Sequence, residues 1–224
     1  MVAVKSVFIV GGAGKVGRSL ARQLAERGHK PRSMHRHAEQ AEELKALGTT
    51  PVAGNLLELD IEALAELMKD SETVVFAAGA GGKGGVQMTE AIDGRGLELS
   101  VAAAQRAGIK RFVLVSAFPE ASRGKTVSET FENYMTIKKR ADVYLAATDL
   151  DWVILRPGTL VDSPGTGKVH TGLAISYGEV PRDDVAATLL QIIEKPDVKH
   201  VIIELTQGPT PVDEAVERFV RDRL

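Results

Sequence analysis

Four glycines near the start of the chain constrain its fold more than any other feature. A run of β-branched and aromatic residues from Val4 to Val10 ends at Gly11, and apolar residues then recur at helical spacing. Between the two, Gly12, Gly14 and Gly17 match the pattern G-x-G-x-x-G, and Gly11 extends it to G-x-x-G-x-x-G. Between a buried strand and an amphipathic helix, this spacing indicates a dinucleotide-binding turn.

The residues of such a turn have separate tasks. An early glycine lets the chain turn sharply, a middle one lets the backbone approach a pyrophosphate, and Gly17 lets the helix lie close to the strand. The first N–H groups of the helix and the positive end of its dipole then face the phosphates. We expect seven consecutive residues to bind the cofactor: Gly11, Gly12, Ala13, Gly14, Lys15, Val16 and Gly17.

The rest of the chain alternates between short apolar runs and amphipathic stretches. Strands are expected at 4–10, 30–35, 50–53, 73–77, 111–116, 151–156 and 200–206, with helices between them. One long helix is expected over 88–107, the capping-box spacing of Thr126 and Glu129 predicts the start of another, and Thr210 with Pro211 predicts the start of the last. This alternation predicts an α/β fold: a Rossmann-type, doubly wound parallel sheet with helices on both faces.

One segment breaks the alternation. Between residues 157 and 181, glycines and prolines interrupt short alternating pieces, which predicts a small C-terminal substrate lobe. Since no linker, low-complexity tract or repeat divides the chain, residues 1–224 are expected to form a single NAD(P)-binding Rossmann domain. The substrate pocket is expected between this lobe and a glycine-rich loop at residues 79–85.

The composition excludes several classes of function. With 28 basic and 30 acidic residues, the net charge of −2 gives no reason to expect nucleic acid or an anionic membrane as a partner. The absence of cysteine excludes disulfides and thiolate sites, and the five histidines lack ligand spacing, so no metal is expected. No apolar run reaches the ~20 residues of a membrane-spanning helix, and the first residues do not resemble a signal peptide, so a cytoplasmic protein is expected.

Further cofactor contacts are expected at the carboxyl ends of the strands, where doubly wound sheets bind their ligands. Arg36 follows the second strand, where an NAD site would carry an acidic residue; its guanidinium can pair with a 2′-phosphate, which favours NADP (NADPH) over NAD. The alternative is a solvated surface arginine. After the next two strands we expect contacts from Asn55 and Leu56 beside the adenine, and from Ala77, Ala78 and Gly79 against a ribose.

Three side chains indicate proton transfer. Ser116 ends the fifth strand, while Tyr134 and Lys138 lie four positions apart and therefore on one face of the following helix. An ammonium near a phenol favours the phenolate, so we expect the pKa of Tyr134 to fall from ~10 toward neutrality and the tyrosine to act as an acid or base. The alternative is a packed tyrosine beside a solvated lysine.

Together these motifs resemble the short-chain dehydrogenase/reductase superfamily, specifically its atypical group with extended-type motifs and an NAD-dependent epimerase/dehydratase-like character. The similar segments are 11–17, 54–56, 107–116, Tyr134 with Lys138, 150–158 and 181–186. The resemblance implies that Tyr134 is the acid/base, that Lys138 binds the nicotinamide ribose, and that Ser116 holds the substrate oxygen. It places Asp93 at a fourth catalytic position, which is usually Asn, and implies nicotinamide contacts from Pro157, Gly158, Thr159 and Leu160.

The sequence therefore predicts an NADP(H)-dependent oxidoreductase or epimerase-like enzyme for an unidentified small-molecule substrate. The short lobe argues against a nucleotide sugar. Two alternatives stay open: a non-catalytic NADP(H)-binding redox sensor or regulatory protein, and a flavin or quinone reductase in which the tyrosine is dispensable. The sequence does not decide between a monomer and a homodimer.

Overall fold

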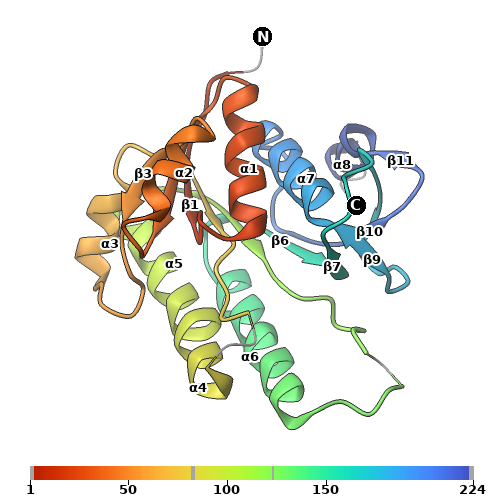
Figure 1. The fold of residues 1–224 in the computed structure, drawn as a ribbon. Helices are drawn as coiled ribbons and strands as arrows, with labels where there is room; N and C mark the ends of the chain where they lie inside the picture. Colours follow the sequence, from red (N-terminus) through yellow and green to blue (C-terminus); the bar gives the residue numbers. More distant parts are fainter. Residues whose placement is uncertain (1–2, 82–83, 123, 222–224) are drawn as a thin grey trace.

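A large, mostly parallel sheet lies at the centre of the computed structural model, which describes residues 3–81, 84–122 and 124–221 (Figure 1). Its strands are β1 (Ser6–Val10), β2 (Lys30–His35), β3 (Thr50–Ala53), β4 (Thr73–Phe76), β5 (Arg111–Val115), β6 (Asp151–Pro157), β8 (Lys168–Gly172), β10 (Val201–Gln207) and β11 (Thr210–Pro211). Their order is β11-β8-β10-β6-β5-β4-β1-β2-β3, and the order reverses at β1. A crevice between β1 and β4 is the usual ligand site of such a sheet.

Helices cover both faces of the sheet (Figure 1). They are α1 (Lys15–Glu26), α2 (Gln40–Ala46), α3 (Ile61–Met68), α4 (Gly85–Thr89), the π-helical turn η1 (Glu90–Arg95), α5 (Gly96–Arg106), α6 (Glu129–Ala146), α7 (Arg182–Glu194) and α8 (Val212–Arg221). One apolar core joins the sheet to α1, α7 and α8, and a second joins it to α3, α5 and α6. The predicted doubly wound α/β fold is confirmed.

Successive residues of the central strands enter opposite cores, which explains their continuous apolar runs. In β1, Val7 and Ile9 pack on the α1 side, while Phe8 and Val10 pack on the α5 side. All four are fully buried. A parallel strand covered by helices on both faces has this composition.

The start of one helix and the interior of another differ from the prediction. Ser128, not Thr126, is the N-cap of α6, and its hydroxyl accepts the N–H of Phe131 at 3.2 Å. The helix expected over 88–107 is divided into α4, η1 and α5. Gly94 and Gly96 lie at this interruption, and glycine favours the α-helix poorly; a Cβ at Gly94 would be 2.8 Å from Nη2 of Arg140, at the flexible end of that side chain.

The segment 157–181 is also arranged differently from the expected lobe. Strand β8 joins the main sheet antiparallel to β10, while β7 (Thr159–Val161) and β9 (Glu179–Pro181) form a separate two-stranded sheet. Thr210 and Pro211 do not begin a helix but pair with β8 as β11. The reason is that β8 presents a free edge to this short segment, and pairing satisfies backbone groups that an N-cap would leave open.

The contact between the glycine turn and β4 can be tested with two substitutions. Gly11 and Gly28 have similar positive φ values, 83° and 81°, but a Cβ at Gly11 would lie 2.6 Å from Cα of Ala78, whereas one at Gly28 would meet nothing within 4 Å. Gly28→Ala should lower the free energy of unfolding in urea by about 1–2 kcal/mol through backbone strain alone. Gly11→Ala should cost roughly 1–3 kcal/mol more because of the clash. Equal costs would contradict the tight packing.

Candidate active site

The glycine turn between β1 and α1 is packed tightly against two neighbouring strands. A Cβ at Gly11 would lie 2.6 Å from the Ala78 backbone, and one at Gly12 would lie 2.5 Å from Cβ of Ser33. Gly14 differs, since it is exposed and a Cβ there would meet only the Gly11 carbonyl, at 3.2 Å. The turn is therefore fixed on its inner side and open on its outer side, as a bound pyrophosphate requires.

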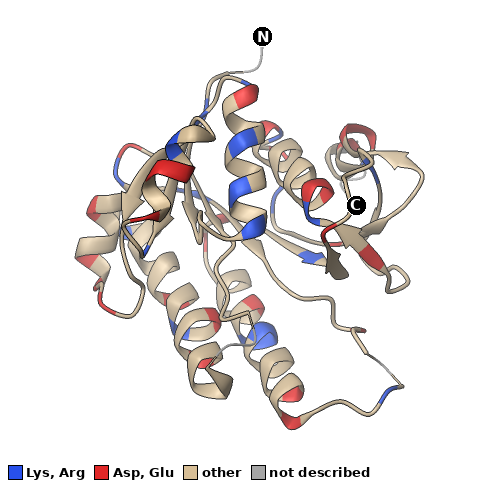
Figure 2. Cartoon of the chain, in the orientation of Figure 1, with Lys and Arg blue, Asp and Glu red and all other residues tan. Residues whose placement is uncertain are grey.

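The start of α1 also presents the open N–H groups and the positive end of the helix dipole that a pyrophosphate needs. Gly14 is its N-cap and supplies no capping side chain, so the first N–H groups stay open. Basic residues recur along the outward side of α1, whereas acidic and basic residues are mixed elsewhere on the visible face (Figure 2). Lys15 pairs with Asp162 and Arg18 with Glu43, each at 2.5 Å. The residues present fit a dinucleotide.

The residues expected around the adenosine end of the cofactor differ in the contacts that they make with the rest of the described chain. Arg36, just beyond β2, is exposed and makes no ion pair within the described part of the chain. Asn55 is occupied locally: its amide donates to Glu58 at 2.7 Å, and its side-chain oxygen accepts the N–H of Leu57 at 3.1 Å. Leu56 is half-buried against the α5-side core.

Asp93 connects the glycine turn with the helix that carries Tyr134. The chain beyond Ala78 passes directly over this carboxylate: Ala80 donates its N–H to Asp93 Oδ2 at 2.9 Å, and a Cβ at Gly79 would lie 3.1 Å from Oδ1. Asp93 is only 3% exposed and lies in the π-helical turn η1. Such turns often occur at functional sites.

Lys138 completes this connection. Its side chain is buried, and its Nζ donates to the Val115 carbonyl at 3.1 Å and lies 3.5 Å from Asp93 Oδ1. A buried ammonium requires such partners, because leaving it unpaired would cost several kcal/mol. Val115 directly precedes Ser116, so one side chain ties the end of β5 to η1.

The pKa of Tyr134 lies opposite to the predicted direction. Burial, which is the largest cause, and the charges of Asp93 and Asp142 together raise the pKa of its phenol to about 12. The expectation that Lys138 lowers this pKa is wrong in this arrangement, because the ammonium is engaged by Asp93 and the Val115 carbonyl. Tyr134 is consequently protonated at neutral pH, as a proton donor must be, although its raised pKa makes it a weaker acid than a free phenol.

Asp142, one turn beyond Lys138, is a site residue that the sequence analysis missed. Its Oδ2 accepts a hydrogen bond from Nε of Arg156 at 2.9 Å and forms an ion pair with Nη2 at 2.9 Å, and burial raises the pKa of its carboxyl. The Ser116 hydroxyl lies near enough to favour the charged form, yet Ser116 Oγ and Asp142 Oδ1 have no well-oriented hydrogen-bond partner in the described chain. The i, i+4, i+8 spacing with Tyr134 could have revealed it.

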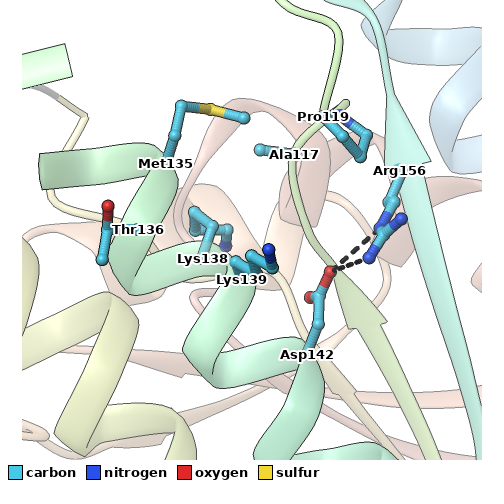
Figure 3. Close-up of a pocket in the computed structure, with 8 residues that line it drawn as sticks. All are labelled: Ala117, Pro119, Met135, Thr136, Lys138, Lys139, Asp142 and Arg156. Atoms are coloured by element: carbon cyan, nitrogen blue, oxygen red, sulfur yellow. Dashed lines mark hydrogen bonds and ion pairs between the residues drawn. The ribbon is translucent and has the colours of Figure 1, made fainter. Parts of the chain in front are cut away.

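A cavity of about 350 Å³ opens beside this cluster (Figure 3). Figure 3 shows the Met135 side chain reaching toward Ala117 and Pro119, with the Asp142–Arg156 pair at one side. The lining residues are Ala117, Pro119, Met135, Thr136, Lys138, Lys139, Asp142 and Arg156. Two further hollows, of about 340 and 630 Å³, continue from Pro119 and Glu120 to residues 174–177.

These positions change the expected location of the pocket. The cavity walls come from α6, the segment after β5, and β6, with residues 174–177 bordering the neighbouring hollows. The loop at 79–85 lines none of them in the described residues, and its residues 82–83 lie outside those described.

The four residues expected at the nicotinamide end form a constrained corner after β6. A Cβ at Gly158 would lie 2.0 Å from the Gly178 carbonyl, so only glycine fits there. Pro157 is buried and Leu160 packs against the α1-side core, whereas Thr159 is exposed and its hydroxyl is hydrogen-bonded to that of Tyr177.

Comparison with known proteins agrees with this fold. The model of the family described as NAD(P)H-binding matches residues 11–196. The uncharacterized sugar epimerase YhfK of Bacillus subtilis (strain 168) is 35% identical over 214 residues, covering 95% of this chain and 99% of YhfK.

Two solved structures are similar over nearly their whole length. A Bacillus halodurans protein, provisionally named an NAD-dependent epimerase/dehydratase, has a TM-score of 0.88 and 32% identity and covers 96% of this chain and 99% of its own. The oxidoreductase ylbE from Lactococcus lactis has a TM-score of 0.85 and 26% identity, with 98% of each chain covered.

The fold and the site therefore define a nicotinamide-dinucleotide-binding protein of the oxidoreductase and epimerase type. The chain belongs to the NAD(P)H-binding family and is an atypical member of the short-chain dehydrogenase/reductase superfamily. No helix in the described ranges is long and apolar enough to cross a membrane.

The protonation state of Tyr134 can be measured directly. With ¹³Cζ-labelled tyrosine, the NMR signal of Tyr134, assigned with Tyr134→Phe, should remain that of a neutral phenol at about pH 10.5, where an unperturbed phenol is largely ionised. Asp93→Asn should lower the pKa of Tyr134, because one negative charge is removed. The half-exposed Tyr144, for comparison, should be unaffected by Asp93→Asn. Ionisation of Tyr134 below pH ~10 would contradict the arrangement.

Proposed function

We propose that this protein is an NADPH-dependent oxidoreductase that reduces a carbonyl group of a small molecule. The observation that carries the proposal is the line of contacts from the glycine turn through Ala78 and Asp93 to Lys138. This line puts the dinucleotide turn and the Ser116–Tyr134–Lys138 group at the same edge of the sheet. Binding and proton transfer would then take place in one crevice.

Different residues of this chain would bind different parts of NADPH. Residues 11–17 would hold the pyrophosphate and Arg36 the 2′-phosphate, while Lys138 and the corner at 157–160 would hold the nicotinamide end. Bound NADPH would supply a hydride to the substrate carbon. The preference for NADPH follows from Arg36, whose guanidinium is exposed at the end of β2 with no ion pair in the described chain.

The chain's own groups would supply the proton. Tyr134, which is protonated at neutral pH, would donate its phenolic proton to the oxygen of the carbonyl as that carbon is reduced, so that an alcohol forms. The Ser116 hydroxyl lies beside Asp142 without a well-oriented hydrogen bond to any described residue, so we assign it to hold that oxygen. Asp93 would keep Lys138 charged and in position.

The size of the cavity favours a small substrate. At about 350 Å³ it lies near the lower end of the ~300–1,000 Å³ usual for ligand pockets. A nucleotide sugar, the substrate class typical of sugar epimerases in this superfamily, would have to extend beyond it into the neighbouring hollows. The name of YhfK therefore does not extend to this chain in our proposal.

The cofactor preference is tested by titrating nicotinamide fluorescence with NADPH and NADH. Arg36→Ala should weaken NADPH binding by roughly 10–100-fold, as expected for loss of a charge-assisted contact, and leave NADH binding nearly unchanged. Arg106→Ala, which removes an exposed arginine paired with Glu62 on α3, is the matched control. Equal affinity of the wild type for both cofactors would contradict the assignment.

The role of Tyr134 is tested with Tyr134→Phe and a panel of aldehydes, ketones and quinones. Turnover of carbonyl compounds should fall at least ~100-fold because the proton donor is lost, while NADPH affinity should change less than ~3-fold. Unchanged turnover of a quinone would select the quinone reductase instead. NADPH binding without turnover of any panel member in the wild type would favour the redox sensor.

A further inference from the structure

The cavity beside α6 has more positive charge than its single carboxylate can balance. Its lining contains three cationic side chains, Lys138, Lys139 and Arg156, and one acid, Asp142. Lys138 is already balanced by Asp93, which lies outside the lining, and Asp142 is balanced by Arg156. Lys139 is left as the uncompensated charge.

Lys139 has no partner that would compete with a ligand. It is exposed and makes no ion pair with any residue in the described ranges, although it is one position from Lys138 and three from Asp142 on α6. Figure 3 shows its side chain at the centre of the cavity view, between Met135 and Asp142. An anionic group entering the cavity would meet this ammonium.

Arg156 offers a second contact. Its guanidinium uses Nε and Nη2 on a single oxygen of Asp142, so Nη1 has no hydrogen-bond partner in the described chain. The pair with Asp142 fixes the plane of the guanidinium, which reduces the entropy lost when Nη1 binds a ligand. A guanidinium held in this way is well suited to a carboxylate oxygen.

The other lining residues limit the kind of molecule that can carry the anionic group. Ala117, Pro119 and Met135 contribute apolar surface to the lining, and the volume of about 350 Å³ suits a small molecule. Methionine adapts its shape to an apolar ligand. The cavity thus combines a cationic side with an apolar wall.

We propose that this cavity is the substrate subsite and that it binds the carboxylate of a small, largely apolar carbonyl acid through Lys139 and Arg156. The inference rests on the proposed reductase function, since it names the substrate class for the same site. Lys138 lines this cavity and donates from its Nζ to the Val115 carbonyl at the end of β5, so the carbonyl of a molecule anchored by its carboxylate would lie toward Ser116 and Tyr134.

The test uses two probes of nearly equal shape, 4-acetylbenzoate and its neutral analogue 4-acetylbenzamide. Their affinities for the full-length protein are measured by ligand-observed NMR, with Lys139→Gln, Lys139→Arg and Lys45→Gln as variants. Lys45, exposed on α2 and paired with Glu42, is a matched control for loss of one positive charge far from the cavity. The wild type and Lys45→Gln should bind the acid roughly 10-fold more tightly than the amide.

Lys139→Gln should reduce this preference to about 3-fold or less, and Lys139→Arg should restore it. Equal binding of the two probes by the wild type, a preference that survives Lys139→Gln, or no binding of the acid at millimolar concentration would each overturn the subsite. The same samples are titrated with NADPH by fluorescence. Acid binding that depends on Lys139 in a protein that does not bind NADPH would support the subsite and refute the reductase.

Discussion

The arrangement of the site depends on one buried ion pair, between Lys138 and Asp93. The two side chains come from helices that are separated in sequence by β5, and each also holds a backbone group: Asp93 the N–H of Ala80, Lys138 the carbonyl of Val115. Removing either charge would leave the other buried and uncompensated, which is strongly unfavourable. The pair thus fixes the ends of β4 and β5 relative to α6, and with them the distance between the glycine turn and Tyr134.

Much of the fold could be predicted from local patterns. The bounds of β2 and β3 are reproduced, and those of the other central strands to within about two residues, because covered parallel strands leave continuous apolar runs. The incorrect predictions fall where contacts with residues distant in sequence determine the secondary structure. The chain at Thr210 and Pro211 became a strand because β8 offered an unpaired edge, and the helix at 88–107 was interrupted where Gly94 accommodates Arg140. Neither neighbour is visible in a local window of sequence.

For the site, too, local spacing could be predicted from the sequence, whereas effects of tertiary contacts could not. The spacing of Tyr134 and Lys138 correctly puts both residues on one helix face, but sequence reasoning gave the wrong direction for the tyrosine pKa. The direction of this pKa shift depends on which carboxylates the fold brings near Tyr134: Asp93 from η1 and Asp142 from the same helix. Asp142 itself was missed because an aspartate within an amphipathic helix usually faces water. Its burial depends on Arg156, fourteen residues away on β6.

The unpartnered atoms Ser116 Oγ and Asp142 Oδ1 have a consequence for the evolution of stability in this protein. Buried polar groups without hydrogen bonds lower the stability of the folded state. Because the pKa of Asp142 is raised on folding, its carboxylate destabilises the protein above that pKa, and this cost disappears as the pH falls through it. Selection for thermal stability alone would replace such groups with apolar ones, so their presence here is expected only where the crevice is under selection for activity.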